Sequence, residues 1–402
     1  LISMKSDKTT PNVPTLRFAE FTDEWEKYEL SHFVTRITRR NKNNESSLPL
    51  TISAQYGLVD QISFFNKTVA SVDLSGYYLL YNGDFAYNKS YSNEYAWGAV
   101  KRLDKYEKGC LSSLYFVFRP NDNVDSDYLT HYFESSKWHK GISNIAGEGA
   151  RNHGLLNMAV DDYFATKHCL PSLPEQKKIA RFFNAITRRI EIQNKIISKY
   201  ETLIKGIYHE FFSKPADYAI KIKDLIIKGK SGGTPSSTVA RYYNGDIPFL
   251  SISDMTKQGK YVSYTEKHIS KSGIENSSAW IVPSNSLIFS MYASVGLVCI
   301  NTVPLATSQA MFSMVLKDRR MIEYIYYYLN FFRETKIHRH IETGTQSNIN
   351  AETVRNIDIP FQSNHLKLVE TLNSIEKRLN NEKDMLSLLL DLKAYLLSKL
   401  FI

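Results

Sequence analysis

The sequence predicts a mixed α/β protein in which two globular domains alternate with two long helices that pair as an antiparallel coiled coil. The chain has 402 residues, of which 43% are apolar and 23% charged, so it can form two or three globular domains. Two stretches carry an apolar heptad pattern, and the order of globular and helical segments repeats. We therefore expect an internal duplication with pseudo-twofold symmetry.

The heptad pattern is the strongest of these signals. The first pattern begins at Phe183, and only Gln193 interrupts it. A second pattern in the same register, shifted by 189 residues, begins at Leu372, and its polar break recurs at Glu382. Heptads sustained over this length are typical of coiled coils, and two such helices in one chain most simply pair with each other. The coiled-coil residues that we expect are Phe183, Ile186, Ile190, Ile197, Ile204, Leu372, Ile375, Leu379, Leu386 and Leu396.

Each predicted helix follows a stretch of alternating β-rich and helical segments. Ser172–Glu175 has the pattern of a capping box, in which Glu175 would satisfy a free amide at the start of the first helix. Pro49–Ser53 resembles Pro248–Ser253, so the two stretches are weakly similar to each other. The expected division is an N-terminal tail at 1–20, globular domains at 21–170 and 214–362, a central helix at 171–213 and a C-terminal helix at 363–402.

Several classes of protein are not expected. The most apolar stretch, Ser286–Ile300, contains three serines and is too short to span a membrane. The three cysteines cannot all pair and lack metal-ligand spacing, which favours a reducing compartment without structural zinc. The polar segment Leu1–Pro14 lacks a hydrophobic signal core. We therefore expect a cytoplasmic protein with no metal site and no membrane partner.

No catalytic residues are expected either. A methyltransferase that acts on amino groups of DNA would need an Asp/Asn-Pro-Pro-aromatic motif, and none of the twelve prolines is adjacent to another. The sequence thus predicts that this chain is not an enzyme.

The charge distribution favours a polyanionic partner. The net charge is +9, and residues 174–363 hold 25 basic and 16 acidic residues. Basic residues cluster at Arg36–Lys42 and at Lys228–Ser231, beside a Gly232–Pro235 turn whose amides could meet phosphates. Such a run can equally be a solvated loop. Polar loop residues of the types that read base edges complete the set. The expected DNA-binding residues are Arg36, Arg39, Arg40, Lys42, Gln55, Tyr56, Asn88, Lys89, Tyr91, Arg151, Lys228, Lys230, Ser231, Thr234, Gln309 and Gln346.

Four segments, in this order and within a duplicated frame, resemble the DNA-sequence specificity subunits of type I restriction-modification systems. They are Val13–Phe18 with Trp25, Leu170–Ile179, Gly232–Ser236 followed by Gly245–Leu250, and Ala306–Gln309. One departure is that Pro360–Asn364, before the second helix, lacks the Glu-Gln pair found at the first.

The resemblance implies a non-catalytic subunit that binds double-stranded DNA. Each globular domain would be a target recognition domain that reads one half of a split sequence, and the coiled coil would set the unread spacer. Two methyltransferase subunits would dock on the helices, and two restriction/translocase subunits would join in the restriction form. S-adenosylmethionine, ATP and Mg are expected in those partners, with no cofactor in this chain.

Two alternatives stay open at this point. The chain could be a DNA-modifying or DNA-cleaving enzyme that acts alone, or a coiled-coil scaffold that binds no nucleic acid. The first requires catalysis by the purified chain, and the second requires that no duplex DNA binds.

Overall fold

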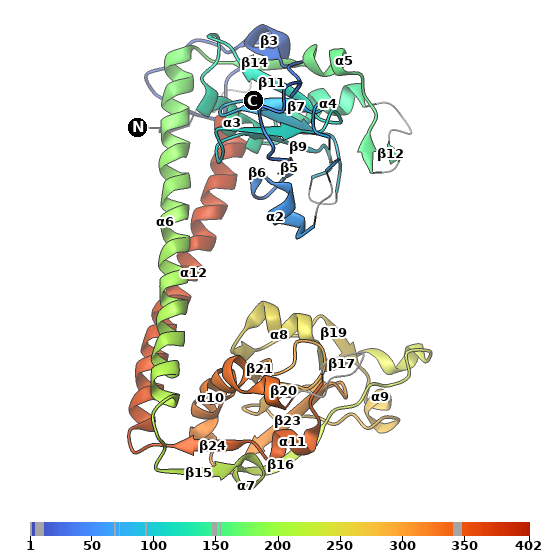
Figure 1. Ribbon diagram of the computed structural model, residues 1–402, viewed down its shortest axis with the longest axis vertical. Coiled ribbons are helices and arrows are strands. Elements are labelled where there is room, and N and C mark those ends of the chain that lie inside the picture. The colour runs from blue at the N-terminus through green and yellow to red at the C-terminus, as the bar shows by residue number, and fades with distance from the viewer. Residues whose placement is uncertain are drawn as a thin grey trace. The chain divides into compact units, whose positions relative to one another are not determined.

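The chain forms two compact units. A computed structural model describes residues 2–4, 12–67, 70–71, 73–92, 95–146, 151–152, 154–340 and 348–402. The first unit comprises residues 1–195 with 384–402, and the second comprises residues 196–383. Both divisions fall inside a long helix, so each unit contains a globular part and a segment of each long helix (Figure 1).

The two long helices expected from the heptads are present. They are α6 (Leu173–Phe212) and α12 (His365–Leu400), of 40 and 36 residues. In the first unit the start of α6 packs on the end of α12, and the rings of Phe183 and Phe401 stack with centroids 5.6 Å apart. In the second unit the end of α6 meets the start of α12, and Gln362 Nε2 donates to the carbonyl of Phe211 at 3.0 Å. Within each unit the helices therefore run antiparallel.

None of the ten predicted coiled-coil residues is exposed. The buried residues are Phe183, Ile197, Ile204, Leu372, Leu379 and Leu396, and the partly buried ones are Ile186, Ile190, Ile375 and Leu386. The predicted polar break at Gln193 is also completely buried. The periodicity thus picked out the covered face of each helix.

The first unit is built around an antiparallel sheet with the strand order β4-β11-β8-β9. Phe85 and Phe118 lie on one face, in a core shared with α3, α5 and the two long helices. Ala86 and Val117 lie on the other face, in a smaller core with β5 and β7. This alternation follows from the period-two geometry of a strand, and it buries both faces of the sheet.

The elements of the first unit have the following bounds. The strands are β1 (Ile2–Met4), β2 (Leu16–Phe18), β3 (Glu26–Glu29), β4 (Val34–Arg36), β5 (Leu50–Ser53), β6 (Gly57–Asp60), β7 (Tyr78–Tyr81), β8 (Phe85–Asn88), β9 (Ala99–Arg102), β10 (Lys108–Leu111), β11 (Phe116–Pro120), β12 (Arg151–Asn152), β13 (Leu155–Leu156) and β14 (Lys167–Leu170). The shorter helices are α1 (Leu30–Phe33), α2 (Gln61–Phe65), α3 (Ser126–Glu134), α4 (His139–Ile145) and α5 (Val160–Phe164).

The second unit contains a five-stranded sheet with the order β16-β23-β20-β21-β18 and a three-stranded sheet with the order β19-β17-β22. Its strands are β15 (Tyr218–Lys221), β16 (Ile226–Ser231), β17 (Tyr243–Leu250), β18 (Tyr261–Val262), β19 (Lys267–Ile269), β20 (Leu287–Ser290), β21 (Val298–Asn301), β22 (Ala306–Thr307), β23 (Met311–Leu316) and β24 (Asp358–Phe361). Its shorter helices are α7 (Ile222–Leu225), α8 (Ile252–Gln258), α9 (Lys271–Glu275), α10 (Ile322–Thr335) and α11 (Ala351–Arg355). Single 3₁₀ turns lie at Ala240–Tyr242, Arg319–Met321 and Ile337–Arg339. Helix α10 packs against β21, and all its aromatic residues except the partly buried Tyr326 are buried.

Both globular parts begin and end in the same way. The first begins with β3 and the one-turn helix α1, and it ends with β14, which pairs antiparallel with β3 directly before α6. The second begins with β15 and α7, and it ends with β24, which pairs antiparallel with β15 directly before α12. The two units therefore repeat one internal plan, as expected for a duplicated chain.

The structure changes the predicted role of Glu175. Its Oε1 and Oε2 accept hydrogen bonds from Nε and Nη2 of Arg17 at 2.8 and 2.7 Å. Both side chains are buried, so the carboxylate pairs with a distant arginine and does not act as the predicted capping residue. A buried arginine without a counter-charge costs more free energy than an uncapped helix end that is open to water.

In the part of the chain that the structure describes, no helix combines the length and the apolar character required to cross a membrane.

Candidate nucleic-acid interface

The Gly-Gly turn of the second unit is a tight backbone contact. The amide of Gly232 donates to the carbonyl of Met311 at 3.1 Å, and that of Gly233 donates to the carbonyl of Thr307 at 2.9 Å. A Cβ on Gly232 would lie 2.0 Å from the Thr307 carbonyl oxygen, so only glycine allows this approach. Both glycines are buried. The prediction that these amides meet phosphates is therefore wrong, because the protein already uses them.

Two predicted DNA-binding residues meet just beyond this turn. Oγ1 of Thr234 donates to Oε1 of Gln309 at 2.6 Å, and both residues are exposed. The bond restrains the side-chain amide of Gln309 and leaves its Nε2 as a free donor. Because the glycines clamp the two backbones together, the Gln309 amide is presented to solvent from a rigid support.

The basic residues of this unit lie on the adjacent strand β16. Lys228 and Lys230 occupy alternate positions and are exposed. The ammonium of Lys228 lies 4.1 Å from the ring centroid of Trp280, which holds it by a cation–π contact. Ser231, half-buried, pairs with Phe312 in the ladder with β23. Lys230 is thus the lysine of this strand most open to an anionic ligand.

In the first unit, a buried carboxylate organises two arginines. Asp84 is completely buried, and its oxygens lie 2.6 Å from Nη2 of Arg39 and 2.6 Å from Nε of Arg119. Arg39 also donates through Nε to the carbonyl of Leu79 at 2.9 Å. One carboxylate balances only one of the two cations, so the pair keeps a positive charge at the surface, where Arg119 is 47% exposed.

Sequence reasoning missed Arg119 and Asp84. Asp84 follows Asn82-Gly83 in a turn, where its carboxylate also accepts from the amide of Tyr81 at 2.8 Å. Arg119 lies one residue before the end of strand β11, 35 residues farther along the chain. Asn82-Gly83 is a common turn dipeptide, but no local pattern predicts that Arg119 lies beside Asp84.

The other basic residues predicted near β4 are dispersed. Arg36 forms an ion pair with Asp161 at 3.6 Å. Arg40 donates to the carbonyl of Gly76 and lies over the ring of Tyr78. Lys42 is exposed. Arg36 and Arg40 therefore already have protein partners, and their guanidinium groups are oriented before any ligand binds.

Five further predicted residues lie in two segments of the first unit. Gln55 and Tyr56 lie exposed in the turn between β5 and β6. Asn88, Lys89 and Tyr91 lie at the end of β8, where Asn88 accepts from the amide of Ser90 and Lys89 lies over Phe116. Arg151 belongs to β12, but its side chain lies outside the described residues, as does the whole of Gln346.

Comparisons with known proteins show what the second unit resembles. A family model described as "Type I restriction modification DNA specificity domain" matches residues 217–385. The MjaIX type I restriction enzyme specificity subunit of Methanocaldococcus jannaschii is 28% identical over 42% of this chain and 40% of that protein. The HindI specificity subunit of Haemophilus influenzae is 32% identical over 46% of this chain and 43% of that protein. The chain thus matches less than half the length of either relative.

Two solved structures share the fold. A chain of a type I R-M system, solved in work on its complex assembly and conformational transition, aligns with a TM-score of 0.57 at 18% identity over 95% of this chain and 98% of its own. The type I restriction-modification S subunit from M. genitalium aligns with a TM-score of 0.54 at 15% identity over 97% of this chain and 99% of its own. These likenesses confirm the predicted fold class.

The resemblance noted in the sequence is therefore confirmed, and specificity subunits are a non-catalytic family. The chain is similar to type I restriction-modification specificity subunits, and its residues 217–385 match the family model of their DNA specificity domain.

Proposed function

We propose that this chain is the DNA-reading subunit of a type I restriction-modification complex, in which each globular part reads one half of a split target. The observation that carries the proposal is the repeated plan of the two units. The specificity domain matched at residues 217–385 begins with a strand and a one-turn helix and ends with a closing strand before a long helix. The first unit has the same order of elements.

Phosphate contacts would supply most of the affinity. Lys230 is exposed on its strand, and Arg119 is held in place by Asp84 with part of its guanidinium in solvent. Each phosphate that such residues neutralise releases counterions, so binding should weaken steeply with salt. Base contacts would supply the specificity, and the oriented amide of Gln309 supports that role in the second unit.

The long helices would set the unread spacer. Two readers on one face of a duplex must lie about 34–36 Å apart, or a multiple of that distance, which is one turn of DNA. A pair of stiff antiparallel helices is a suitable ruler, since each α-helical residue adds about 1.5 Å. Because the globular parts have diverged in sequence, the two half-sites should differ.

The partners would perform the chemistry. Two methyltransferase subunits would dock on the helices and carry S-adenosylmethionine, and two restriction/translocase subunits with ATP and Mg would join in the restriction form. A methyltransferase must flip its target base out of the duplex, so the complex needs a separate part that holds the DNA.

Co-expression with the methyltransferase subunits tests the proposal. Single-molecule sequencing of methylated DNA should reveal one split motif, and exchanging residues 214–362 for another specificity domain should change one half of it. Methylation or cleavage by the purified chain alone would favour the stand-alone enzyme. Absence of duplex binding at low salt, with or without the partner, would favour the scaffold.

A further inference from the structure

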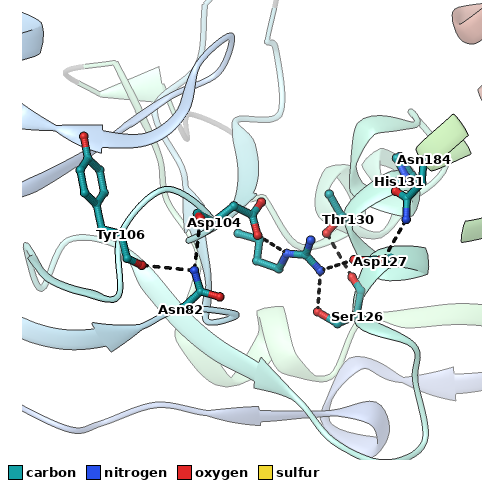
Figure 2. A network of polar contacts seen from close by, with 9 residues as sticks. Asn82, Asp104, Tyr106, Ser126, Asp127, Thr130, His131 and Asn184 are labelled. Atoms are coloured by element: carbon teal, nitrogen blue, oxygen red, sulfur yellow. Dashed lines mark hydrogen bonds and ion pairs between the residues drawn. The ribbon is translucent and has the colours of Figure 1, made fainter. Parts of the chain in front are cut away.

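One asparagine of α6 joins the long helix to the globular part of the first unit. Nδ2 of Asn184 donates to Oδ2 of Asp127 at 2.8 Å, and Oδ1 of Asn184 lies 2.8 Å from Nε2 of His131 (Figure 2). Asp127 and His131 lie one turn apart on α3. A single side chain of the long helix therefore contacts two successive turns of the globular part.

Asp127, Asn184 and His131 together form the asparagine joint of the first unit. Its carboxylate, Asp127, is also bound to the sheet of that unit. Nη1 of Arg102, at the end of β9, lies 2.7 Å from Oδ1 of Asp127 and 2.9 Å from Oγ of Ser126. Burial raises the pKa of Asp127, but hydrogen bonds from Arg102 and Asn184 outweigh it and hold that pKa below its usual range. The carboxylate stays ionised and accepts from both sides.

The second unit builds the same joint on α12. Nδ2 of Asn373 donates to Glu323, and the hydroxyl of Tyr327 donates to Oδ1 of Asn373 at 3.2 Å. Glu323 and Tyr327 lie one turn apart on α10. Lys260 takes the place of the arginine, with Nζ 3.2 Å from Oε1 of Glu323, and its side chain is only 9% exposed.

The correspondence extends to the residue numbers. Asn184 and Asn373 are separated by 189 residues, the same interval as the two heptad patterns. Asp127 and Glu323 are separated by 196 residues, and the same interval separates His131 from Tyr327. The asparagine is the same in both units, but its partners differ: the acid, the cation, and the residue one turn after the acid. The two units therefore share the geometry of these contacts and not the identity of the residues.

Each globular part is also tied to the other long helix. In the first unit Lys393 of α12 lies 2.9 Å from Glu134. Burial raises the pKa of Glu134, but His131 and Lys393 together lower it to about 2. In the second unit Lys205 of α6 lies 2.8 Å from Glu334. Both long helices of each unit therefore hold the globular part by polar contacts.

Apolar packing beneath these contacts does not by itself define an orientation. The rings of Tyr128 and Phe401 have centroids 5.4 Å apart in the first unit, and those of Tyr324 and Phe212 have centroids 5.4 Å apart in the second. Hydrophobic contacts are non-directional and tolerate rotation, whereas hydrogen bonds have narrow angular limits. The asparagine joints are thus the directional part of each attachment.

We propose that Asn184 and Asn373 are positioning residues for DNA recognition, each fixing the orientation of one globular part on its helix pair. They would thereby set the spacing and helical phase at which the two half-sites are read, without touching a base. The inference rests on the proposed DNA-reading function. It adds that the asparagine contacts, together with the length of the helices, determine the spacer.

The test uses the full chain co-expressed with its methyltransferase subunits and a DNA library in which only the unread spacer varies. In the variant Asn373→Leu the half-site bases should stay the same. Methylation of targets with spacers one base pair longer or shorter should rise about tenfold relative to methylation of targets with the original spacer. A change of about tenfold corresponds to the free energy that is lost with one charge-assisted hydrogen bond. Asn381→Leu, at an exposed position of the same helix, should keep the original preference.

Asn184→Leu provides a second and independent variant, because Asn184 lies at the surface and its loss should disturb folding least. It should broaden the spacer preference in the same way. An unchanged preference in both folded variants would overturn the inference, and so would an equal loss of methylation at every spacer length. If the unmodified chain directs methylation to no split site, the proposed function itself fails.

Discussion

Arg17 and Glu175 form a buried bidentate ion pair between strand β2 and the first turn of α6. Their side chains are 5% and 1% exposed, and 158 residues separate them in the chain. The pair fixes the place where the long helix leaves the first globular part. It also orients the first turn of α6 next to Gln176, whose Oε1 accepts from the amide of Asp125 at 2.8 Å.

Removing the charge of Glu175 should be costly. Glu175→Gln leaves the buried Arg17 without a counter-charge, and breaking such a pair costs about 3–5 kcal/mol. Urea unfolding should show a lower midpoint. Glu20→Gln, in the exposed pair of Glu20 with Lys178, should hardly move the midpoint, and equal shifts for the two variants would contradict the burial argument.

Base selection in the second unit should depend on Gln309. Gln309→Ala should relax one position of one half-site, since a good contact to a base is worth about 1–3 kcal/mol of discrimination. Thr234→Val should relax the same position to a smaller extent, because the amide loses its orienting bond. Sequencing of methylated DNA measures both effects. Thr238→Val, in the same exposed loop, is the matched control, and a change in its motif would argue against a specific Thr234–Gln309 unit.

Lys230 and Arg39 should behave differently. Lys230→Ala should lower the slope of log affinity against log salt by about one, with no change in stability. Arg39→Ala should instead lower the free energy of unfolding by about 2 kcal/mol, because the buried Asp84 loses a partner. Salt titrations of duplex binding and urea unfolding separate the two effects.

Lys214→Ala is the control for both measurements. It removes a lysine already paired with Glu210, and it should leave both measurements unchanged.

The buried His168 should make the first unit sensitive to acid. Burial lowers the pKa of His168 to about 4, while its hydroxyl neighbours Tyr132 and Thr166 lie 2.7 and 2.8 Å from its ring nitrogens. The unfolded chain, with a pKa of about 6.5, binds the proton more readily. Stability from this group is therefore complete above about pH 6.5 and falls by about 3 kcal/mol as the pH drops towards 4.

His168→Gln should flatten the plot of unfolding free energy against pH over that interval. The exposed His32→Gln variant should keep the slope of the unmodified chain. If His168→Gln retained the full slope, the acid sensitivity would have to come from other groups.

Lengthening both long helices should lengthen the spacer. Seven residues inserted in each of α6 and α12, in register, preserve the heptads and add about 10 Å, which is about three base pairs. Sequencing of methylated DNA should report unchanged half-sites separated by a longer gap. An unchanged gap would show that the length of the helices does not set the length of the spacer.

Much of the architecture could be predicted from the sequence because it depends on local periodicity. A heptad pattern needs only the geometry of one helix, so Phe183 and Leu372 marked buried faces without knowledge of the fold. The duplication was equally visible, because shifted copies of one pattern can be compared along the chain. The resemblance to specificity subunits rested on the order of short segments, which is also a property of the linear chain.

Side-chain roles depended on contacts between distant segments, which no local pattern encodes. Glu175 looked like a helix cap until Arg17 was found beside it, and the amides of Gly232 and Gly233 looked available until the chain near Thr307 was found to occupy them. The sequence alone therefore determined the helices, the repeat and the resemblance to specificity subunits, because these follow from periodicity and order. Only the tertiary structure decided which charges are buried in pairs and which polar groups face solvent, because folding alone brings their partners within hydrogen-bonding distance.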